Sequence, residues 1–343
     1  MMIQGHTLSA ILIPEAKATS LYQFLHILRG LTAPAFLIAS GCGFAFSMMR
    51  KKNLDWYHTL SRRLRRITPI LLMGYFLHLP RFSLYQLLTQ ITDKEIAQFL
   101  QCDILQTIGW TIIVLQVIFI FSPLRKIIVP VSLIGLLLIL IFTPQINNSI
   151  IMPNFFTQLL TSRFGSNFPL FPFSAYLLFG FLFGYVFHRV QEYVELKKIV
   201  APIFISGIIF FGASFIVKIT DFALFYQRTG PLLILISLFL LIESKKSDVL
   251  NFFVVIGQES LLIYIFHLII IYGSVLNRVH NFVYYFGDRS NTFIGVVLAI
   301  ALIIFMLCLG YLWHYFKLKH LSAARVIRNS FIALITTKFI TSL

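Results

Sequence analysis

Long apolar runs without a single charge, such as VSLIGLLLILIFTP at 131–144, constrain the fold of this chain more than any other feature. Of the 343 residues 58% are hydrophobic and 12% are charged, and the mean hydropathy is +0.87. A soluble domain carries about twice that charged fraction. Runs of about 20 apolar residues can instead cross a bilayer as helices. The sequence therefore predicts an all-α fold, a polytopic bundle of transmembrane helices.

About ten spans are expected. Nine apolar segments lie at about 31–49, 67–80, 103–122, 127–143, 169–187, 200–218, 231–243, 251–275 and 292–314. Residues 1–13 are apolar but too short for a crossing, so we interpret them as the second half of a truncated first helix. We expect one transmembrane domain over 1–314, followed by a basic, amphipathic cytoplasmic tail over 315–343 on the inner membrane surface.

The distribution of charge predicts how these helices are oriented. The net charge of +16 comes from 28 basic and 12 acidic residues. Of the basic residues, 19 lie in the C-terminal tail or in the loops on one side of the membrane, if loops alternate between the two sides. Cytoplasmic loops collect Lys and Arg, which explains the positive charge without nucleic acid as a partner. The inside loops are then 50–66, 123–126, 188–199 and 244–250, and the outside loops are 81–102, 144–168 and 276–291.

The cysteines give no reason to expect a metal. Cys42, Cys102 and Cys308 are scattered along the chain, and two of them lie in apolar segments. No pair of cysteines, and no cysteine with a histidine, has the spacing of a zinc site. We therefore expect no bound metal.

The segment FLHILRGLTAPAFLIASG, residues 24–41, places polar groups at the mouth of a span. His26 and Arg29 are three residues apart and so lie on the same side of a helix. Gly30 and Pro34 interrupt helices, and a broken helix at membrane depth is tolerated where it lines a cavity. The alternative is interfacial, with Arg29 reaching lipid phosphate and His26 merely at the surface.

A second polar face is predicted in CDILQTIGW. Asp103, Gln106 and Trp110 follow one another at i, i+3 and i+7, which is one face of a helix. Gln106 must find hydrogen bonds inside the bundle. A carboxylate at a helix N-terminus is also favoured by the helix dipole, so Asp103 has a purely structural explanation as well.

A third polar face is predicted in GQESLLIYIFHL, where Ser260, Tyr264 and His267 follow at i, i+4 and i+7. Ionisable groups inside a membrane are costly, so each is a candidate functional residue. A lone histidine in a bundle is more often structural, but here it shares a face with a hydroxyl and a phenol.

Two further motifs have competing interpretations. SRRLRRITP holds Arg62, Arg63, Arg65 and Arg66 on the inner side. Topology alone explains this cluster, whereas guanidinium groups also suit the phosphates of an anionic cytosolic donor. Residues 180–184 form a GxxxG motif, which indicates close helix packing and would allow a homodimer.

The segments HILRGLTAPAFLIASG, DILQTIGW, FPLFPFSAYLLFGFLFG and GQESLLIYIFHLIIIYG occur in this order along the chain. Together they resemble the membrane acyltransferases related to heparan-alpha-glucosaminide N-acetyltransferase, and in particular their bacterial branch. The likeness covers about residues 2 to 275. It implies an integral protein of the bacterial cytoplasmic (inner) membrane, with no bound cofactor and with acetyl-CoA as co-substrate. The acetyl group would pass from cytosolic acetyl-CoA to a sugar or glycan acceptor on the outer side.

The resemblance also implies where the chemistry takes place. A histidine on the non-cytosolic side, between the first and second helices, carries it, and His26 matches by its position before GLT. The Leu105–Gln106 pair matches a motif of the fourth helix. Such proteins usually begin with an Arg- and Asp-containing stretch that ends near MIQGH, whereas here MMIQGHTL is the first block. His6 is therefore the second candidate for the catalytic histidine.

The expected mechanism uses the imidazole of His26 to deprotonate the acceptor as it attacks the thioester, or to carry the acetyl group briefly itself. Arg29 or Gln106 would support the oxyanion, and Asp103 would orient His26. Substrate binding is assigned to Arg29, Trp110, Ser260, Tyr264 and His267, and donor binding to Arg62, Arg63, Arg65 and Arg66. The alternatives are a transporter or flippase for a sugar or lipid-linked sugar, and a non-catalytic membrane protein.

Overall fold

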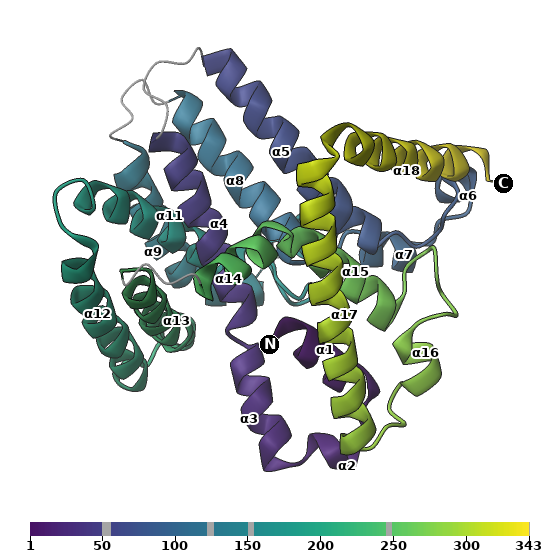
Figure 1. Cartoon of the computed structure of the whole chain (residues 1–343), viewed down its shortest axis with the longest axis horizontal. Helices are drawn as coiled ribbons and strands as arrows, with labels where there is room; N and C mark the ends of the chain where they lie inside the picture. The colour runs from purple at the N-terminus through teal and green to yellow at the C-terminus, as the bar shows by residue number, and fades with distance from the viewer. Residues whose placement is uncertain (50–55, 122–126, 150–153, 245–248, 343) are drawn as a thin grey trace. The chain divides into compact units, whose positions relative to one another are not determined.

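The computed structural model describes residues 1–49, 56–121, 127–149, 154–244 and 249–342 (Figure 1). Within these ranges the structure is helical, and the single β-bridge joins Leu12 to Ser290. The prediction of an all-α fold is confirmed. The helices fall into two compact units, which are described separately below.

The first unit comprises Met1–Arg29, Leu77–Phe99 and Asp248–Leu343. Its helices are α1 (Met2–Ile11), α2 (Pro14–Lys17), α3 (Ser20–Arg29), α6 (Leu84–Thr89), α7 (Asp93–Phe99), α14 (Val249–Gln258), α15 (Ser260–Tyr272), α16 (Phe282–Phe286), α17 (Thr292–Lys319) and α18 (Leu321–Thr341).

The second unit comprises Gly30–Phe76 and Leu100–Ser247. Its helices are α4 (Thr32–Met49), α5 (Trp56–Leu77), α8 (Ile104–Phe121), α9 (Ile128–Ser149), α10 (Asn154–Leu160), α11 (Leu170–Val190), α12 (Leu196–Ile216) and α13 (Thr220–Ser244).

Six helical stretches in the described ranges are long and apolar enough to cross a bilayer, and the number rises to eight if two bent pairs are each one span. The six are Ser20–Met49, Ile128–Asn148, Leu170–Val190, Leu196–Ile216, Thr220–Ser244 and Thr292–Lys319, and the bent pairs are α7 with α8 and α14 with α15. The two remaining expected spans fail this test for physical reasons. Helix α1 has 10 residues, and the first half of α5 carries the arginine cluster.

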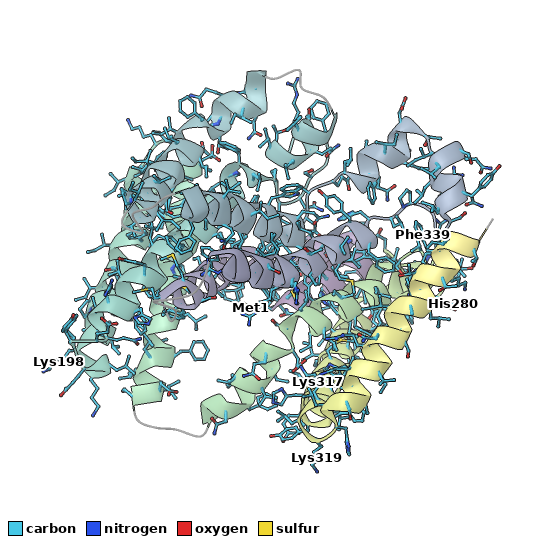
Figure 2. All side chains as sticks on the ribbon, turned by 90° about the horizontal axis from the view of Figure 1, so that it is seen from above. Met1, Lys198, His280, Lys317, Lys319 and Phe339 are labelled. Carbon is cyan, nitrogen blue, oxygen red and sulfur yellow. The ribbon has the colours of Figure 1, made fainter. Side chains whose placement is uncertain are left out.

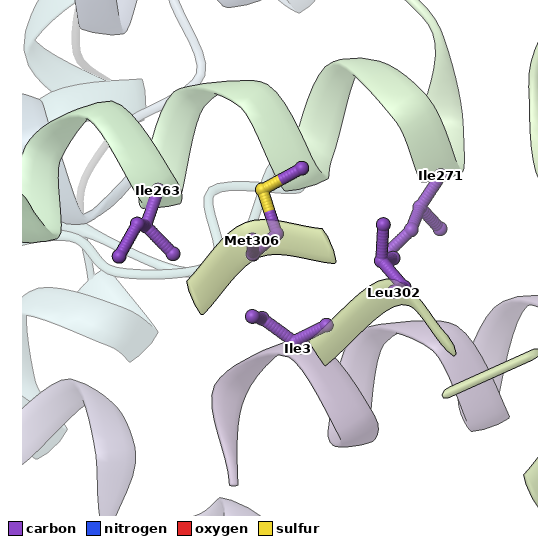
Figure 3. Packing of buried hydrophobic residues seen from close by; sticks show 5 residues of the cluster. All are labelled: Ile3, Ile263, Ile271, Leu302 and Met306. Atoms are coloured by element: carbon purple, nitrogen blue, oxygen red, sulfur yellow. The ribbon is translucent and has the colours of Figure 1, made fainter. Parts of the chain in front are cut away.

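The core of the first unit forms where α1, α15 and α17 meet (Figure 3). Ile3, Ile263, Ile271, Leu302 and Met306 are buried there against one another. In a bilayer such packing stabilises through van der Waals contact, because lipid tails are as apolar as these side chains. This packing holds α1 and α15 side by side, although about 260 residues separate them in the sequence.

The core of the second unit is built on a close crossing of α4 and α11. A methyl group added at Gly41 would lie 2.6 Å from the Phe181 nitrogen, and one added at Gly180 would lie 2.6 Å from the Ile38 Cα. One added at Gly184 would lie 2.8 Å from the Cys42 Cα. The GxxxG motif is therefore occupied within the chain, and it no longer argues for a homodimer, which stays a prediction.

The C-terminal helix shows a contact that the sequence pattern did not predict. Lys317 and Lys319 mark the end of α17, and Phe339 marks the far end of α18 (Figure 2). The Phe339 ring lies 5.8 Å from that of Phe82, just before α6, and the Ser83 hydroxyl donates to the Ser342 carbonyl. The tail and residues 81–102 were predicted on opposite sides of the membrane. Helix α18 carries Arg325, Arg328 and Lys338 and is not among the helices that are apolar enough to cross a bilayer. The contact therefore places the end of the tail beside residues 81–102, and the two predicted placements do not agree.

Candidate functional site

Two histidines from distant parts of the sequence meet in the first unit. His6 on α1 and His267 on α15 have ring centroids 5.5 Å apart. The packing of the Ile3 and Ile271 side chains fixes this approach, since each lies on the same helix as one of the histidines, three or four residues away. Two imidazoles at this separation lie close enough for one reacting group to contact both rings.

His267 is fully buried and has one unsatisfied ring nitrogen. Its Nδ1 lies 2.8 Å from the Ile263 carbonyl oxygen, one turn earlier in α15. A carbonyl only accepts, so Nδ1 carries the proton and Nε2 presents a lone pair. Nε2 is buried and has no hydrogen-bond partner in the described structure. A buried polar atom without a partner is costly, which makes this nitrogen a candidate for a functional role.

Two tyrosines extend the pair in opposite directions. The hydroxyl of Tyr272 lies 3.2 Å from His6 Nδ1, and Tyr272 is exposed. The buried ring of Tyr264 lies 5.6 Å from that of His267. Polar rings therefore run from buried His267 through half-buried His6 to the surface of the unit. We call His6, Tyr264, His267 and Tyr272 the histidine cluster.

The aliphatic stem of Arg29 packs on α1 at Gly5, the residue before His6. A methyl group at Gly5 would lie 2.6 Å from Arg29 Cδ, so the absence of a side chain at position 5 lets the stem rest on α1 next to His6. The sequence predicted Arg29 as a site residue, and the structure packs its stem on Gly5, the residue that precedes the second candidate histidine in α1. The physical reason is the close packing of α3 on α1.

His26, the first candidate for catalysis, lies outside the histidine cluster. It is exposed, and the contact that the structure records is with the ring of Tyr22, 6.2 Å away on the same helix. Ser260 opens α15 and is half-buried. The role of His26 stays a prediction, but the burial that would tune and orient a catalytic imidazole is found at His267.

Sequence reasoning missed a buried ion cluster at the break between α14 and α15. Glu259, 4% exposed, lies 3.0 Å from His314 Nδ1 and also accepts a hydrogen bond from Lys317, both on α17. The two half-helices are bent by 63° at this point. Glu259 was visible in the sequence as a carboxylate in an apolar segment, but its partners lie more than 50 residues away. The cluster fastens the N-terminus of α15 to α17.

In the second unit, Asp103 and Gln106 cap α8. The Asp103 Oδ1 accepts from the Ile104 N–H at 2.9 Å, and the Gln106 Oε1 accepts from the Asp103 N–H at 3.2 Å. These two bonds satisfy the backbone N–H groups of Asp103 and Ile104 at the start of the helix. Trp110 donates through Nε1 to the Tyr75 hydroxyl at 3.1 Å, which ties α8 to α5. The structural explanation of Asp103 therefore has direct support.

The arginine cluster divides between the interior and the surface. Arg63 is buried, donates to Gln116 Oε1 at 2.8 Å and lies over the rings of Phe44 and Phe119. Arg65 and Arg66 are exposed. The side chain of Arg62 lies outside the described residues. Arg63 therefore joins α5 to α4 and α8 inside the second unit, and the exposed Arg65 and Arg66 are available to an anion.

Comparison with known proteins decides the class. The model of the family described as an acyltransferase domain matches residues 1–314. The chain belongs to this family. It is therefore a multi-pass membrane protein of an acyltransferase family, and the match spans the predicted transmembrane domain. No curated protein and no solved structure matches the chain.

Acyl transfer requires side chains that can move a proton or hold an acyl group. In the part of the chain that the structure describes, no group of three or more His, Cys, Asp or Glu side chains could hold a metal ion. The histidine cluster offers an imidazole nitrogen with a free lone pair. Acid–base or covalent catalysis by imidazole is the chemistry that this arrangement can perform.

Proposed function

We propose that this membrane acyltransferase moves an acetyl group from cytosolic acetyl-CoA to a sugar or glycan acceptor on the other side of the membrane. The family match supports acyl transfer, and the sequence resemblance to the enzymes related to heparan-alpha-glucosaminide N-acetyltransferase supports this donor and acceptor. The exposed Arg65 and Arg66 suit the phosphates of the donor.

The buried lone pair of His267 Nε2 is the observation that carries the proposed mechanism. Nε2 removes the proton from the acceptor hydroxyl or amine as the acceptor attacks the thioester carbonyl. The carbon–sulfur bond breaks, and the proton passes from the imidazolium to the departing thiolate, so that free CoA leaves. Such general base catalysis typically contributes about 100- to 10,000-fold to the rate.

His6 and Tyr272 complete the proposed site. Tyr272 can donate to His6 Nδ1, which fixes the orientation of the His6 ring beside His267. A covalent variant, in which one imidazole takes the acetyl group from CoA and then passes it to the acceptor, uses the same residues and balances in the same way. In that case the label remains on the protein when no acceptor is present.

The test uses full-length protein reconstituted into lipid vesicles with acetyl-CoA radiolabelled in the acetyl group. A panel of amino sugars and glycan oligomers serves as acceptors. We expect label on an acceptor with the wild-type protein, and a loss of about 100-fold or more in His267→Ala. His6→Ala is expected to lose activity as well. Thermal unfolding of each variant shows whether it remains folded.

The matched control is His280→Ala. His280 also pairs with a tyrosine, Tyr285, at 2.9 Å, but this pair is exposed and joins the segment before α16 to α16 itself. The control is expected to keep wild-type activity. Loss of activity in His26→Ala with full activity in His267→Ala would return the catalytic role to His26. Uptake of a sugar without any transfer of label would favour the transporter alternative.

A further inference from the structure

A polar cavity of about 400 Å³ lies in the first unit, apart from the histidine cluster. It forms between α6, α7, the segment that follows α15 and the end of α18. Its lining residues are Arg81, Phe82, Ser83, Gln86, Glu95, Val275, Arg278 and Ser342. Cavities that bind small molecules typically hold about 300 to 1,000 Å³, so the volume suits one or two sugar rings.

One of the two guanidinium groups in this cavity is already neutralised. Arg81 donates through Nε and Nη2 to the two carboxylate oxygens of Glu95, at 2.8 and 3.1 Å, and through Nη1 to Gln90 at 3.1 Å. This bidentate pair fixes the geometry of the Arg81 side chain. It contributes almost no net charge to the cavity.

The other guanidinium has no carboxylate opposite it among the described side chains. Arg278 is exposed and donates through Nη2 to the Pro80 carbonyl. This bond holds the group at the wall of the cavity and uses one of its five N–H donors. The lining therefore carries a net charge of about +1, because Arg278 adds a positive charge to the balanced pair of Arg81 and Glu95.

The rest of the wall combines hydroxyl groups with an aromatic base. The Ser83 hydroxyl donates to the Ser342 carbonyl, and the Ser342 hydroxyl donates to the Phe82 carbonyl, both at 2.6 Å. The Ser83 oxygen also accepts from the Gln86 N–H at 3.3 Å, and each of the two hydroxyl oxygens keeps a lone pair that can accept a hydrogen bond from a ligand. The ring of Phe82 packs on that of Phe339 at 5.8 Å. Hydroxyl acceptors beside an aromatic face suit the hydroxyl groups and the apolar face of a sugar.

We propose that this cavity binds a sugar bearing one oxyanion, whose charged group pairs with Arg278. A guanidinium fork binds carboxylate and phosphate in the same bidentate manner, so the shared chemistry is an acidic sugar. The hydroxyl groups of the sugar then meet Ser83 and Ser342. This site is separate from the histidine cluster, and the proposal does not depend on the acyl-transfer mechanism.

Titration calorimetry on the full-length protein in detergent tests the proposal with three probes: glucuronate, glucose 6-phosphate and glucose. We expect at least one of the two acidic sugars to bind at least about tenfold more tightly than glucose, because the charge-assisted bond to Arg278 is absent with glucose. Comparing the two acidic sugars shows whether the carboxylate or the phosphate is preferred. Arg278→Gln should weaken binding of the preferred acidic sugar by about 10- to 100-fold and leave binding of glucose nearly unchanged.

The matched control is Arg289→Gln, an exposed arginine after α16 that does not line the cavity. It should bind the acidic sugar as the wild-type protein does. The proposal is overturned if neither acidic sugar binds more tightly than glucose, or if Arg278→Gln and Arg289→Gln weaken binding equally. Acetyl transfer assayed in Arg278→Gln shows separately whether the histidine cluster still works.

Discussion

The crossing of α4 and α11 allows a sharp test, because two glycines on α4 differ in what faces them. At Gly41 an added methyl group would lie 2.6 Å from the Phe181 nitrogen and closer still to the Leu177 carbonyl oxygen. At Gly43, two residues further along, nothing lies within 4 Å of an added methyl group. Gly41→Ala and Gly43→Ala therefore make the same chemical change in two different environments.

The expected magnitudes follow from these distances. Ordinary contacts between carbon and polar backbone atoms are about 3.3 Å or longer, so Gly41→Ala must separate the two helices by at least about 0.7 Å. The facing atoms are backbone and cannot rotate away, which places the cost at the upper end of overpacking, about 3 kcal/mol. Replacing glycine by alanine inside a helix by itself raises the free energy of unfolding by about 1 kcal/mol at either position. Gly41→Ala should thus lower the free energy of unfolding by about 2 kcal/mol, and Gly43→Ala should raise it by up to about 1 kcal/mol.

Reversible unfolding in mixed detergent micelles, with increasing SDS and helicity followed by circular dichroism, measures both variants against the wild-type protein. The quantity of interest is the difference between the two, about 3 kcal/mol. Equal free energies of unfolding for Gly41→Ala and Gly43→Ala would refute the reasoning, since the close approach of α4 and α11 would then not exist.

Three further predictions concern charged groups. Glu259→Gln should lower the free energy of unfolding by about 2 kcal/mol in the same assay, because it removes the buried carboxylate that Lys317 and His314 of α17 contact. Glu195→Gln, which removes an exposed pair, should change it by less than about 0.5 kcal/mol. Asp103→Ala should lower the free energy of unfolding by about 1 kcal/mol, because a helix cap is lost, whereas Asp103→Asn should keep both stability and acetyl transfer. Loss of transfer in Asp103→Asn would show that the negative charge is needed. Arg65→Gln should raise the KM for acetyl-CoA without affecting stability, and Arg63→Gln should lower stability; the reverse pattern would contradict the division between surface and interior.

The apolar runs were sufficient to predict the all-helical membrane fold, because lipid forces each crossing segment to satisfy its own backbone hydrogen bonds. The periodicity of GQESLLIYIFHL likewise placed Tyr264 and His267 on one face, where their rings are in contact. It could not show that Glu259 sits at a break in this helix. The partners of Glu259 at this bend are His314 and Lys317, which come from another helix.

Sequence alone determined the class of this protein, the positions of most of its helices and the short set of polar residues from which a site could be built. Tertiary structure decided which of them meet. It joined His6 to His267 across about 260 residues, left His26 exposed, turned Asp103 into a helix cap and opened a polar cavity beside Arg278. The reason is that helix periodicity is a local property, whereas the pairing of helices depends on how side chains distant in the sequence fill space together.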